Sequence, residues 1–337
     1  MLSKISMRVR VLALRMSRLR KLLILRLVWA IALVSLLLAG SIYAVANVFI
    51  SNEAESSALS GNATAVTDTS ASGASAVKFG SAPSATWPDA TNTGVAGCPA
   101  LQQVSTVSDG YQVNLNQDGM VYENKEIMNE TVLRVRANNV TIRCVKMHGI
   151  GWYGIDNTEI STVTGTVVDK VEVDCQDKGF VVGLLLHDVI VTRVNVHHCD
   201  HMMNSGGDNV SISDSYCHDL TDLPGVHADC FQNLSGNTNV QILHNSFWGW
   251  DTSDVLLGQE YGEASNIVVD GNRFLSDPNK TPPAYLLYNS GTNTIVRNNF
   301  FTTRYTYGHC TDNKAPGSTL TWTNNRWWEN NAVISGC

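Results

Sequence analysis

Basic residues are scarce in most of this chain. Of its 23 Lys and Arg residues, eight lie in residues 1–50, which contain no Asp or Glu. The other 15 stand against 30 acidic residues, so the chain after residue 50 has a formal charge of −15. Nucleic acids and anionic lipids bind through Lys and Arg side chains that neutralise phosphate groups. The composition therefore argues against a nucleic-acid partner for this part of the chain.

The chain also lacks any CxxC pair, the spacing typical of a zinc site. All eight cysteines follow residue 97, and an even number of cysteines in an exported protein indicates disulfides. We therefore expect disulfides in preference to zinc. The sequence does not determine the pairing. Cys310 and Cys337 are separated by about the length of one sequence repeat, described below, which favours them as partners.

Residues 27–50 form an uncharged run of 24 residues. About 20 apolar residues cross a bilayer as a helix, so we predict a transmembrane signal-anchor here. The basic cluster before the run is expected to stay in the cytoplasm, which places the C-terminal body outside. A cleaved signal peptide, with a cleavage site at Ala44-Val45-Ala46, is the alternative. Residues 51–93, rich in Ser, Ala and Thr, are predicted to form a flexible linker, and residues 94–337 the folded domain.

A repeat of about 27 residues runs through the second half of the chain. Each copy holds two apolar residues in alternation, then an asparagine and a large apolar residue. The asparagines are Asn245, Asn272, Asn299 and Asn325, at steps of 27, 27 and 26 residues. Weaker copies begin at Val140, Val171, Val189 and Val210. The alternation predicts a short strand, and the period is too short for a strand, helix and strand unit.

This repeat predicts one turn of a solenoid per copy, with the asparagines stacked as a hydrogen-bonded ladder at a bend between strands. The residues resemble the pectin-lyase-like superfamily of right-handed parallel β-helix proteins. We therefore predict an all-β fold, a right-handed parallel β-helix of roughly eight coils. The resemblance implies a fold and not an activity, because lyases, hydrolases and non-catalytic surface proteins share it.

The string Gly225-Val-His227-Ala-Asp229-Cys-Phe-Gln232 is the first candidate for a site. His227 and Asp229 lie two residues apart, on one face of the expected strand. Asp254 follows Asp229 by 25 residues, about one coil, so we expect the two carboxylates on neighbouring rungs. Paired acids are what glycoside hydrolysis requires. The alternative is that both aspartates occupy turn edges and bond their own backbone.

The same string resembles the Asn-Thr-Asp-Gly-Phe-Asp motif of the polygalacturonase family, with His227 in place of Asn and Gln232 in place of the second Asp. The resemblance implies a catalytic role for Asp229. The Gly-His-Gly and Arg-x-Lys signatures of that family are missing, so its pectate specificity does not carry over. A His-x-Asp-x-x-Gln signature of secreted bacterial β-helix proteins is the closer match.

Histidines and aromatic residues surround this string. His197 and His218 occupy the same position in adjacent copies of the repeat, so we expect them to stack in one column with Trp248 next. Near them in the sequence lie His198, Asp200, His201, Asp219 and Asp222. Such side chains suit acid–base chemistry or a Ca²⁺ or transition-metal site. We predict catalytic roles for Asp229, His227, Asp254 and His218, and substrate binding by Gln232, His197, Trp248, Trp250 and Tyr261.

We predict an extracytoplasmic polysaccharide hydrolase that uses paired acids and is attached to the membrane through residues 27–50. A polysaccharide lyase is the first alternative, and it would need a bound cation because residues 197–263 contain no Lys or Arg. A non-catalytic module for adhesion or glycan binding is the second. No cofactor is predicted, with Ca²⁺ as the alternative.

Overall fold

The computed structural model describes residues 63–67, 75–79, 86–104, 111–128, 130–225, 227–233, 236–258, 262, 264–312 and 319–337. Their contacts divide the chain into two units, residues 1–82 and 83–337. In the first, β1 (Ala63–Thr67) pairs antiparallel with β2 (Ser75–Phe79). Both strands lie in the segment predicted as linker. The predicted anchor, residues 27–50, lies outside the described residues, among which no helix is long and apolar enough to span a bilayer.

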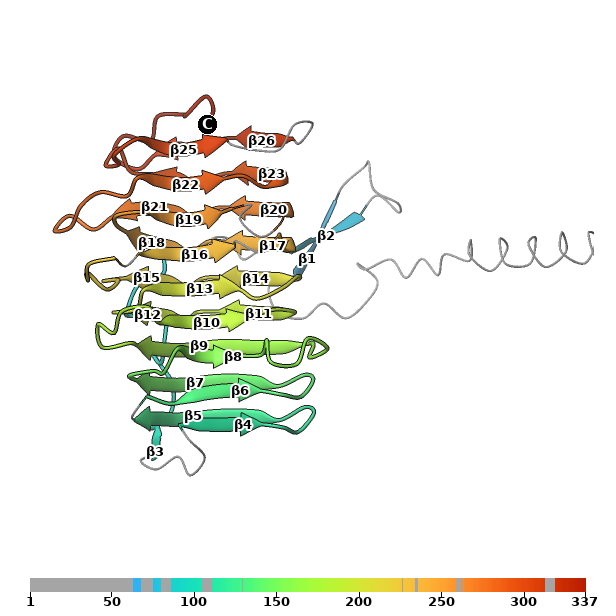
Figure 1. Ribbon diagram of the computed structural model, residues 1–337. Coiled ribbons are helices and arrows are strands. Elements are labelled where there is room, and N and C mark those ends of the chain that lie inside the picture. The colour runs from blue at the N-terminus through green and yellow to red at the C-terminus, as the bar shows by residue number, and fades with distance from the viewer. Residues whose placement is uncertain are drawn as a thin grey trace, which may run out of the picture. The chain divides into compact units, whose positions relative to one another are not determined.

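The second unit is a right-handed parallel β-helix, which confirms the predicted fold (Figure 1). One sheet has nine parallel strands, one per coil, so there is one coil more than the roughly eight predicted. Its strands are β4 (Gln112–Leu115), β6 (Val132–Val135), β8 (Tyr153–Asp156), β10 (Val182–Leu186), β13 (His201–Ser205), β16 (Asp229–Asn233), β19 (Ser253–Leu257), β22 (Tyr285–Asn289) and β25 (Gly308–Asp312).

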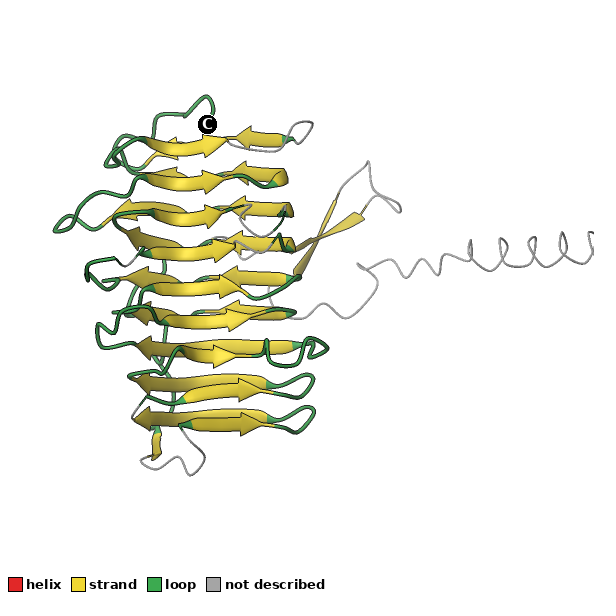
Figure 2. Ribbon diagram, in the orientation of Figure 1, coloured by secondary structure: helices red, strands yellow, loops and turns green. Residues whose placement is uncertain are grey.

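The other sheet has sixteen strands, and no helix occurs among the described residues (Figure 2). Its strands are β3 (Gln102–Val104), β5 (Val121–Met128), β7 (Thr141–His148), β9 (Thr166–Asp174), β11 (Val189–Thr192), β12 (Asn195–His197), β14 (Val210–Ser213), β15 (Tyr216–His218), β17 (Thr238–Leu243), β18 (Ser246–Gly249), β20 (Ser265–Asp270), β21 (Arg273–Ser276), β23 (Thr292–Arg297), β24 (Phe300–Phe301), β26 (Leu320–Thr323) and β27 (Arg326–Trp327).

A bend divides the later strands of this sheet into two. The continuous strand β9 pairs with both β11 and β12, and from there on each coil contributes two short strands. The residue at the bend adopts a left-handed conformation, with φ of 52° at Arg193, 51° at Asp214 and 52° at His244. This conformation is costly for most side chains, so the stacked coils on either side must stabilise it.

The predicted asparagine ladder lies at this bend and is confirmed. The Asn245 side-chain amide donates to Asn272 Oδ1 at 3.0 Å, Asn272 donates to Asn299 at 3.0 Å, and Asn299 donates to Asn325 at 2.9 Å. Each of the four side chains also donates to a backbone carbonyl of the coil before it, as Asn272 does to Ile242 at 2.8 Å. All four asparagines are fully buried. The ladder thus satisfies buried polar groups that the bend would otherwise leave unpaired.

Apolar side chains fill the inside of the coils. Phe247, Phe274 and Phe301 lie one per coil directly after the ladder, with ring centroids 5.7 and 4.6 Å apart. The segment before the first coil packs on the outside, where the Trp87 ring stacks on His244 at 5.2 Å and Arg273 donates to the Pro88 carbonyl. Residues 86–93 therefore contact the coils although they fall within the predicted linker.

All eight cysteines form disulfides, as predicted. The expected pair Cys310–Cys337 is present, and it ties the last described coil to the C-terminus. The others are Cys98–Cys144, Cys175–Cys199 and Cys217–Cys230. Disulfides of this number fit an oxidising compartment outside the cytoplasm.

We expect the Asn272→Ala variant to lose roughly 2–4 kcal/mol of unfolding free energy, because it leaves buried partners in two adjacent coils unpaired. Denaturant unfolding followed by circular dichroism measures this loss. Asn279→Ala is the control, because Asn279 is an exposed residue in the loop that follows β21. Equal stability of the two variants would contradict a stabilising role for the ladder.

Candidate functional site

The strongest concentration of buried acid–base groups lies on β13 and β16, in the middle of the nine-stranded sheet. His201 stands opposite Asp229 in the parallel register. The backbone N–H of Asp229 donates to His201 Nδ1 at 3.2 Å, and Asp229 Oδ2 lies 3.8 Å from the same nitrogen. On the other side of the ring, Asp200 Oδ2 lies 3.7 Å from Nε2. The imidazole therefore lies between two carboxyl groups, and the Asp229 backbone N–H is the group that bonds to it.

Asp229 is fully buried, and its carboxyl group contacts polar side chains. It accepts hydrogen bonds from the Thr252 hydroxyl at 2.9 Å and from the Gln232 amide at 3.2 Å. Burial raises the pKa of Asp229 to about 8, against the opposing effect of the Thr252 and Ser253 hydrogen bonds. Asp229 and Gln232, predicted separately as a catalytic and a substrate-binding residue, thus lie together, and Gln232 is half-buried.

The neighbouring groups respond to the same burial. Desolvation lowers the pKa of His201 to about 4, so the ring is neutral near pH 7. Desolvation also raises the pKa of Asp200 to about 6, and its Oδ1 is buried without a hydrogen-bond partner. The backbone of the exposed residue His227 donates to Asp200. Because His201 Nδ1 accepts the Asp229 N–H, the proton of the neutral ring lies on Nε2, toward Asp200.

Asp200 and His201 were noted in the sequence but not assigned to the site. The signal for them was present, since His201 precedes Asp229 by 28 residues, close to one coil. The repeat therefore predicts them on neighbouring rungs. What the repeat did not reveal is which carboxyl group of this region faces outward.

Asp254 does not form the expected outward pair with Asp229. Asp229 stands opposite Ser253, so Asp254 is one residue out of register and matches Cys230 on the previous coil. Cys230 points inward, since it bonds to Cys217. The Asp254 carboxyl likewise lies inside the coil, next to Gly249, where any β-carbon would collide with it. Like Asp229, it is fully buried, and burial raises its pKa against the opposing effect of a hydrogen bond from the Gly249 backbone. The two carboxyl groups therefore differ in their neighbours and not in their exposure.

His218 and His197 lie on β15 and β12, in the sixteen-stranded sheet, and not beside Asp229. Their rings stack at 5.1 Å, which confirms the histidine part of the predicted column. His218 is further held by Asn195 at 2.9 Å and Asp219 at 2.6 Å, and burial lowers the pKa of His218. In the part of the chain that the structure describes, ligand atoms close enough together to share a metal ion belong to Asp174, His197 and His198.

The three aromatic residues predicted to bind substrate lie in different surroundings. Trp250 is only 7% exposed and packs in the core, with Lys280 Nζ 5.1 Å from its ring centroid, so it is not a platform for a sugar. Trp248 is half-buried on β18, in register with Leu275. Tyr261 lies outside the described residues.

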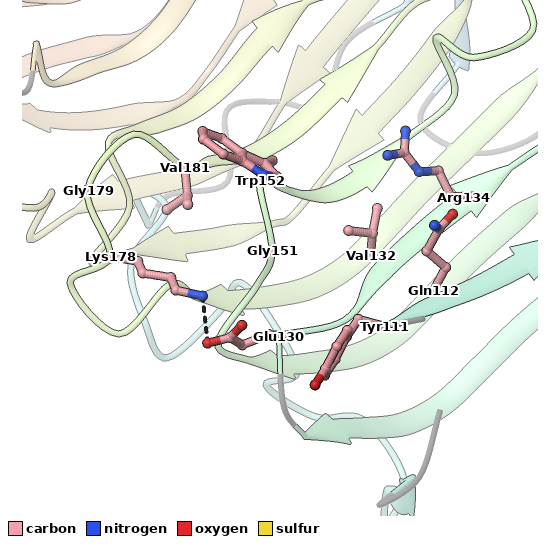
Figure 3. A pocket seen from close by; sticks show the side chains of 10 residues that line it. All are labelled: Tyr111, Gln112, Glu130, Val132, Arg134, Gly151, Trp152, Lys178, Gly179 and Val181. Atoms are coloured by element: carbon pink, nitrogen blue, oxygen red, sulfur yellow. Dashed lines mark ion pairs between the residues drawn. The ribbon is translucent and has the colours of Figure 1, made fainter. Parts of the chain in front are cut away.

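A second surface carries aromatic rings that sequence reasoning missed. An open cavity of about 450 Å³ lies over the first coils of the nine-stranded sheet (Figure 3). Trp152 and Tyr111 line it and are 72% and 64% exposed. Lys178, which pairs with Glu130 at 2.6 Å, and Arg134, which pairs with Asp156, add charged groups. Exposed rings beside polar groups form a surface on which a sugar ring can stack.

No family model matches the chain, and no curated protein matches it. Among solved structures, the chain is similar to the A-module of the mannuronan C-5 epimerase AlgE4 from Azotobacter vinelandii, with a TM-score of 0.36 and 14% identity. The similarity covers 67% of this chain and 68% of that one. At this identity it concerns the fold alone.

Buried Asp229 and Asp254 predict a stability that falls as the pH rises. Burial raises the pKa of both in the folded state, so the folded chain keeps protons that the unfolded chain has released. Their stabilising contribution is therefore complete below about pH 4 and is lost toward the folded pKa, by at most about 1.4 kcal/mol per pH unit and group.

We expect the unfolding free energy of Asp254→Asn to fall less than that of the parent as the pH rises from about 5 to about 8. The reason is that the substitution removes one of the two titrating groups. Urea unfolding at several pH values measures the slope. An unchanged slope in Asp254→Asn would show that this carboxyl group does not hold a proton in the folded protein.

Proposed function

We propose that this protein is an extracytoplasmic carbohydrate-active enzyme that binds a polysaccharide along the outer face of the nine-stranded sheet and cleaves it by acid–base chemistry around His201. The observation that supports the proposal is the position of the His201 imidazole between the carboxyl groups of Asp200 and Asp229, at 3.7 and 3.8 Å. Four disulfides and the predicted signal or anchor at residues 27–50 support a location outside the cytoplasm.

The geometry supports a revised acid pair for hydrolysis. Asp200 and Asp229 replace Asp229 and Asp254, and they approach opposite nitrogens of one ring. Hydrolysis of a glycosidic bond needs one carboxyl group that donates a proton and another that acts on the opposite side. A carboxyl group that burial keeps protonated near neutral pH, such as Asp229, is suited to the first role.

The surroundings favour a substrate that is bound through neutral donors. Gln232 and Thr252 lie next to Asp229, and no Lys or Arg occurs in residues 197–263, to which Lys280 reaches at the Leu220 carbonyl. A lyase must neutralise a uronate carboxylate, usually with a cation. Hydrolysis therefore fits this centre better, and the products of the reaction distinguish the two chemistries.

We expect Asp229→Asn and His201→Gln to lower the release of reducing ends from a panel of neutral and uronic-acid polysaccharides by about 100-fold or more, because each removes part of the proton-transfer group. Reducing ends report hydrolysis, whereas ultraviolet absorbance of an unsaturated end reports a lyase.

Asp254→Asn is the matched control. It makes the same chemical change on the adjacent strand, but inside the coil, so it should retain turnover. If Asp229→Asn were as active as Asp254→Asn, the assigned centre would be wrong. An absence of turnover on every polysaccharide, with the parent protein folded, would refute enzymatic activity.

Glycan binding without turnover is the second candidate, and the exposed rings of Trp152 and Tyr111 favour it (Figure 3). We expect Trp152→Ala to weaken retention on an insoluble or immobilised polysaccharide by roughly tenfold, because a stacked aromatic ring contributes about 1 kcal/mol or more. Affinity electrophoresis of the variant and of Ile190→Ala measures this. Ile190 is 53% exposed on β11, so that equal losses in both variants would exclude a specific role for the cavity.

A further inference from the structure

Three potential metal ligands converge on the outer face of the sixteen-stranded sheet. The Nδ1 atoms of His197 and His198 lie 2.9 Å apart. Asp174 Oδ1 lies 2.9 Å from His198 Nδ1 and 3.7 Å from His197 Nδ1. Ligand atoms at about 2.0–2.1 Å from a tetrahedral ion are separated by distances of this size.

The fold explains why these residues meet. His197 stands opposite Asp174 in the parallel register of β12 and β9. His198 follows in a left-handed conformation with φ of 55°, and its ring comes back to contact both the His197 ring and Asp174. The Cys175–Cys199 disulfide joins the residues that directly follow Asp174 and His198. The covalent link and the sheet register hold all three side chains together before any ion binds.

The contact between the two Nδ1 atoms needs a shared positive charge or proton. A neutral imidazole carries a proton on one nitrogen and a lone pair on the other. If neither Nδ1 is protonated, two lone pairs face each other at 2.9 Å. One proton on His198 Nδ1 or His197 Nδ1 makes a hydrogen bond of either the His197–His198 contact or the His198–Asp174 contact, but not of both. A cation bound among the three atoms would be attracted to all of them.

The surroundings orient His197 in the way that metal sites require. Glu172 Oε1 lies 3.7 Å from His197 Nε2, the nitrogen that faces away from Asp174, and Lys146 holds this carboxylate at 2.7 Å. The His218 ring stacks on the His197 ring at 5.1 Å. Metal-binding histidines commonly direct their second nitrogen to a carboxylate, which fixes the ring and its tautomer.

We propose that Asp174, His197 and His198 bind one divalent transition-metal ion of the Zn²⁺ class, with an open coordination position. Two imidazole nitrogens and one carboxylate suit Zn²⁺ and its neighbours, whereas Ca²⁺ requires six to eight oxygen ligands. His198 also lines an open cavity of about 450 Å³ together with Asp177, Asp219, Asp222 and Lys280. The fourth position can therefore be filled by water or a small ligand that enters there.

This site is separate from the proposed carbohydrate centre, because its ligands lie on or directly after strands of the other sheet. The two are nevertheless joined by one turn, in which His198 precedes Asp200 by two residues. Bound metal would hold this turn in place. Failure of one proposal leaves the other intact, because metal binding is measured without any substrate.

The test uses the full-length chain, freed of metal with a chelator and then of the chelator. We expect it to bind one Zn²⁺ per chain in competition with a chromophoric chelator, and Co²⁺ to give the visible absorption of a four-coordinate nitrogen and oxygen site. His198→Ala and Asp174→Asn should each weaken Zn²⁺ binding by more than tenfold, and Glu172→Gln by about 10–100-fold.

His244→Ala is the matched control, since His244 also pairs with a carboxylate, Asp214 at 2.6 Å, and has an aromatic ring as its stacked neighbour. It should bind Zn²⁺ like the parent. If His198→Ala fails to fold, Asp174→Asn decides by the same titration, because it keeps the shape of the side chain. Zn²⁺ binding that is equal in parent and Asp174→Asn, or displaced by an equal concentration of Ca²⁺, would overturn the proposal.

Discussion

The structure depends on one constraint, which is that residues one coil apart lie directly opposite each other on adjacent strands. The buried amide ladder from Asn245 to Asn325 enforces this constraint at the bend. Each of the four side chains bonds a carbonyl of the coil before, and the first three also bond the next asparagine. A slip of one residue would break the ladder and move every strand side chain to the opposite face. The register therefore fixes which side chains can act together on the surface, including His201 with Asp229 and Asp174 with His197.

The sequence repeat predicted much of the register between coils. It predicted the coil, the asparagine ladder, the stacked His197 and His218 and the Cys310–Cys337 pair, because each depends only on the number of residues per turn. It did not predict the direction of Asp254, because the nine-stranded sheet departs from simple alternation. Cys230 and Phe231 are successive residues and both are fully buried, as are Asp254 and Val255 one coil later. The parallel register continues unbroken through these residues, and no pattern in the sequence marks the run of buried side chains.

The same departure from simple alternation accompanies the contact between Asp229 and Gln232, which are three residues apart. In a regular strand, residues at this separation point to opposite faces. Here two buried residues lie between them, and the Gln232 amide still reaches the Asp229 carboxyl at 3.2 Å. The spacing His-x-Asp-x-x-Gln is thus matched to this strand shape. Asp229 and Asp254, one residue out of register on neighbouring strands, consequently differ in surroundings. Asp229 accepts hydrogen bonds from Thr252 and Gln232, whereas Asp254 lies against the Gly249 backbone inside the coil.

The short turn between β12 and β13 joins two kinds of chemistry that the fold otherwise keeps apart. Residues 197 and 198 belong to the outer face of the sixteen-stranded sheet, whereas residues 200 and 201 belong to the nine-stranded sheet. Cys199 stands between them, and its disulfide to Cys175 anchors the turn to the coil before. The next coil has a further disulfide, Cys217–Cys230, which spans the interior beside Asp229. These two disulfides therefore lie where the acidic and histidine side chains are concentrated. Carboxyl groups buried with few partners cost stability, and covalent closure of short loops is one means by which a coil can tolerate them.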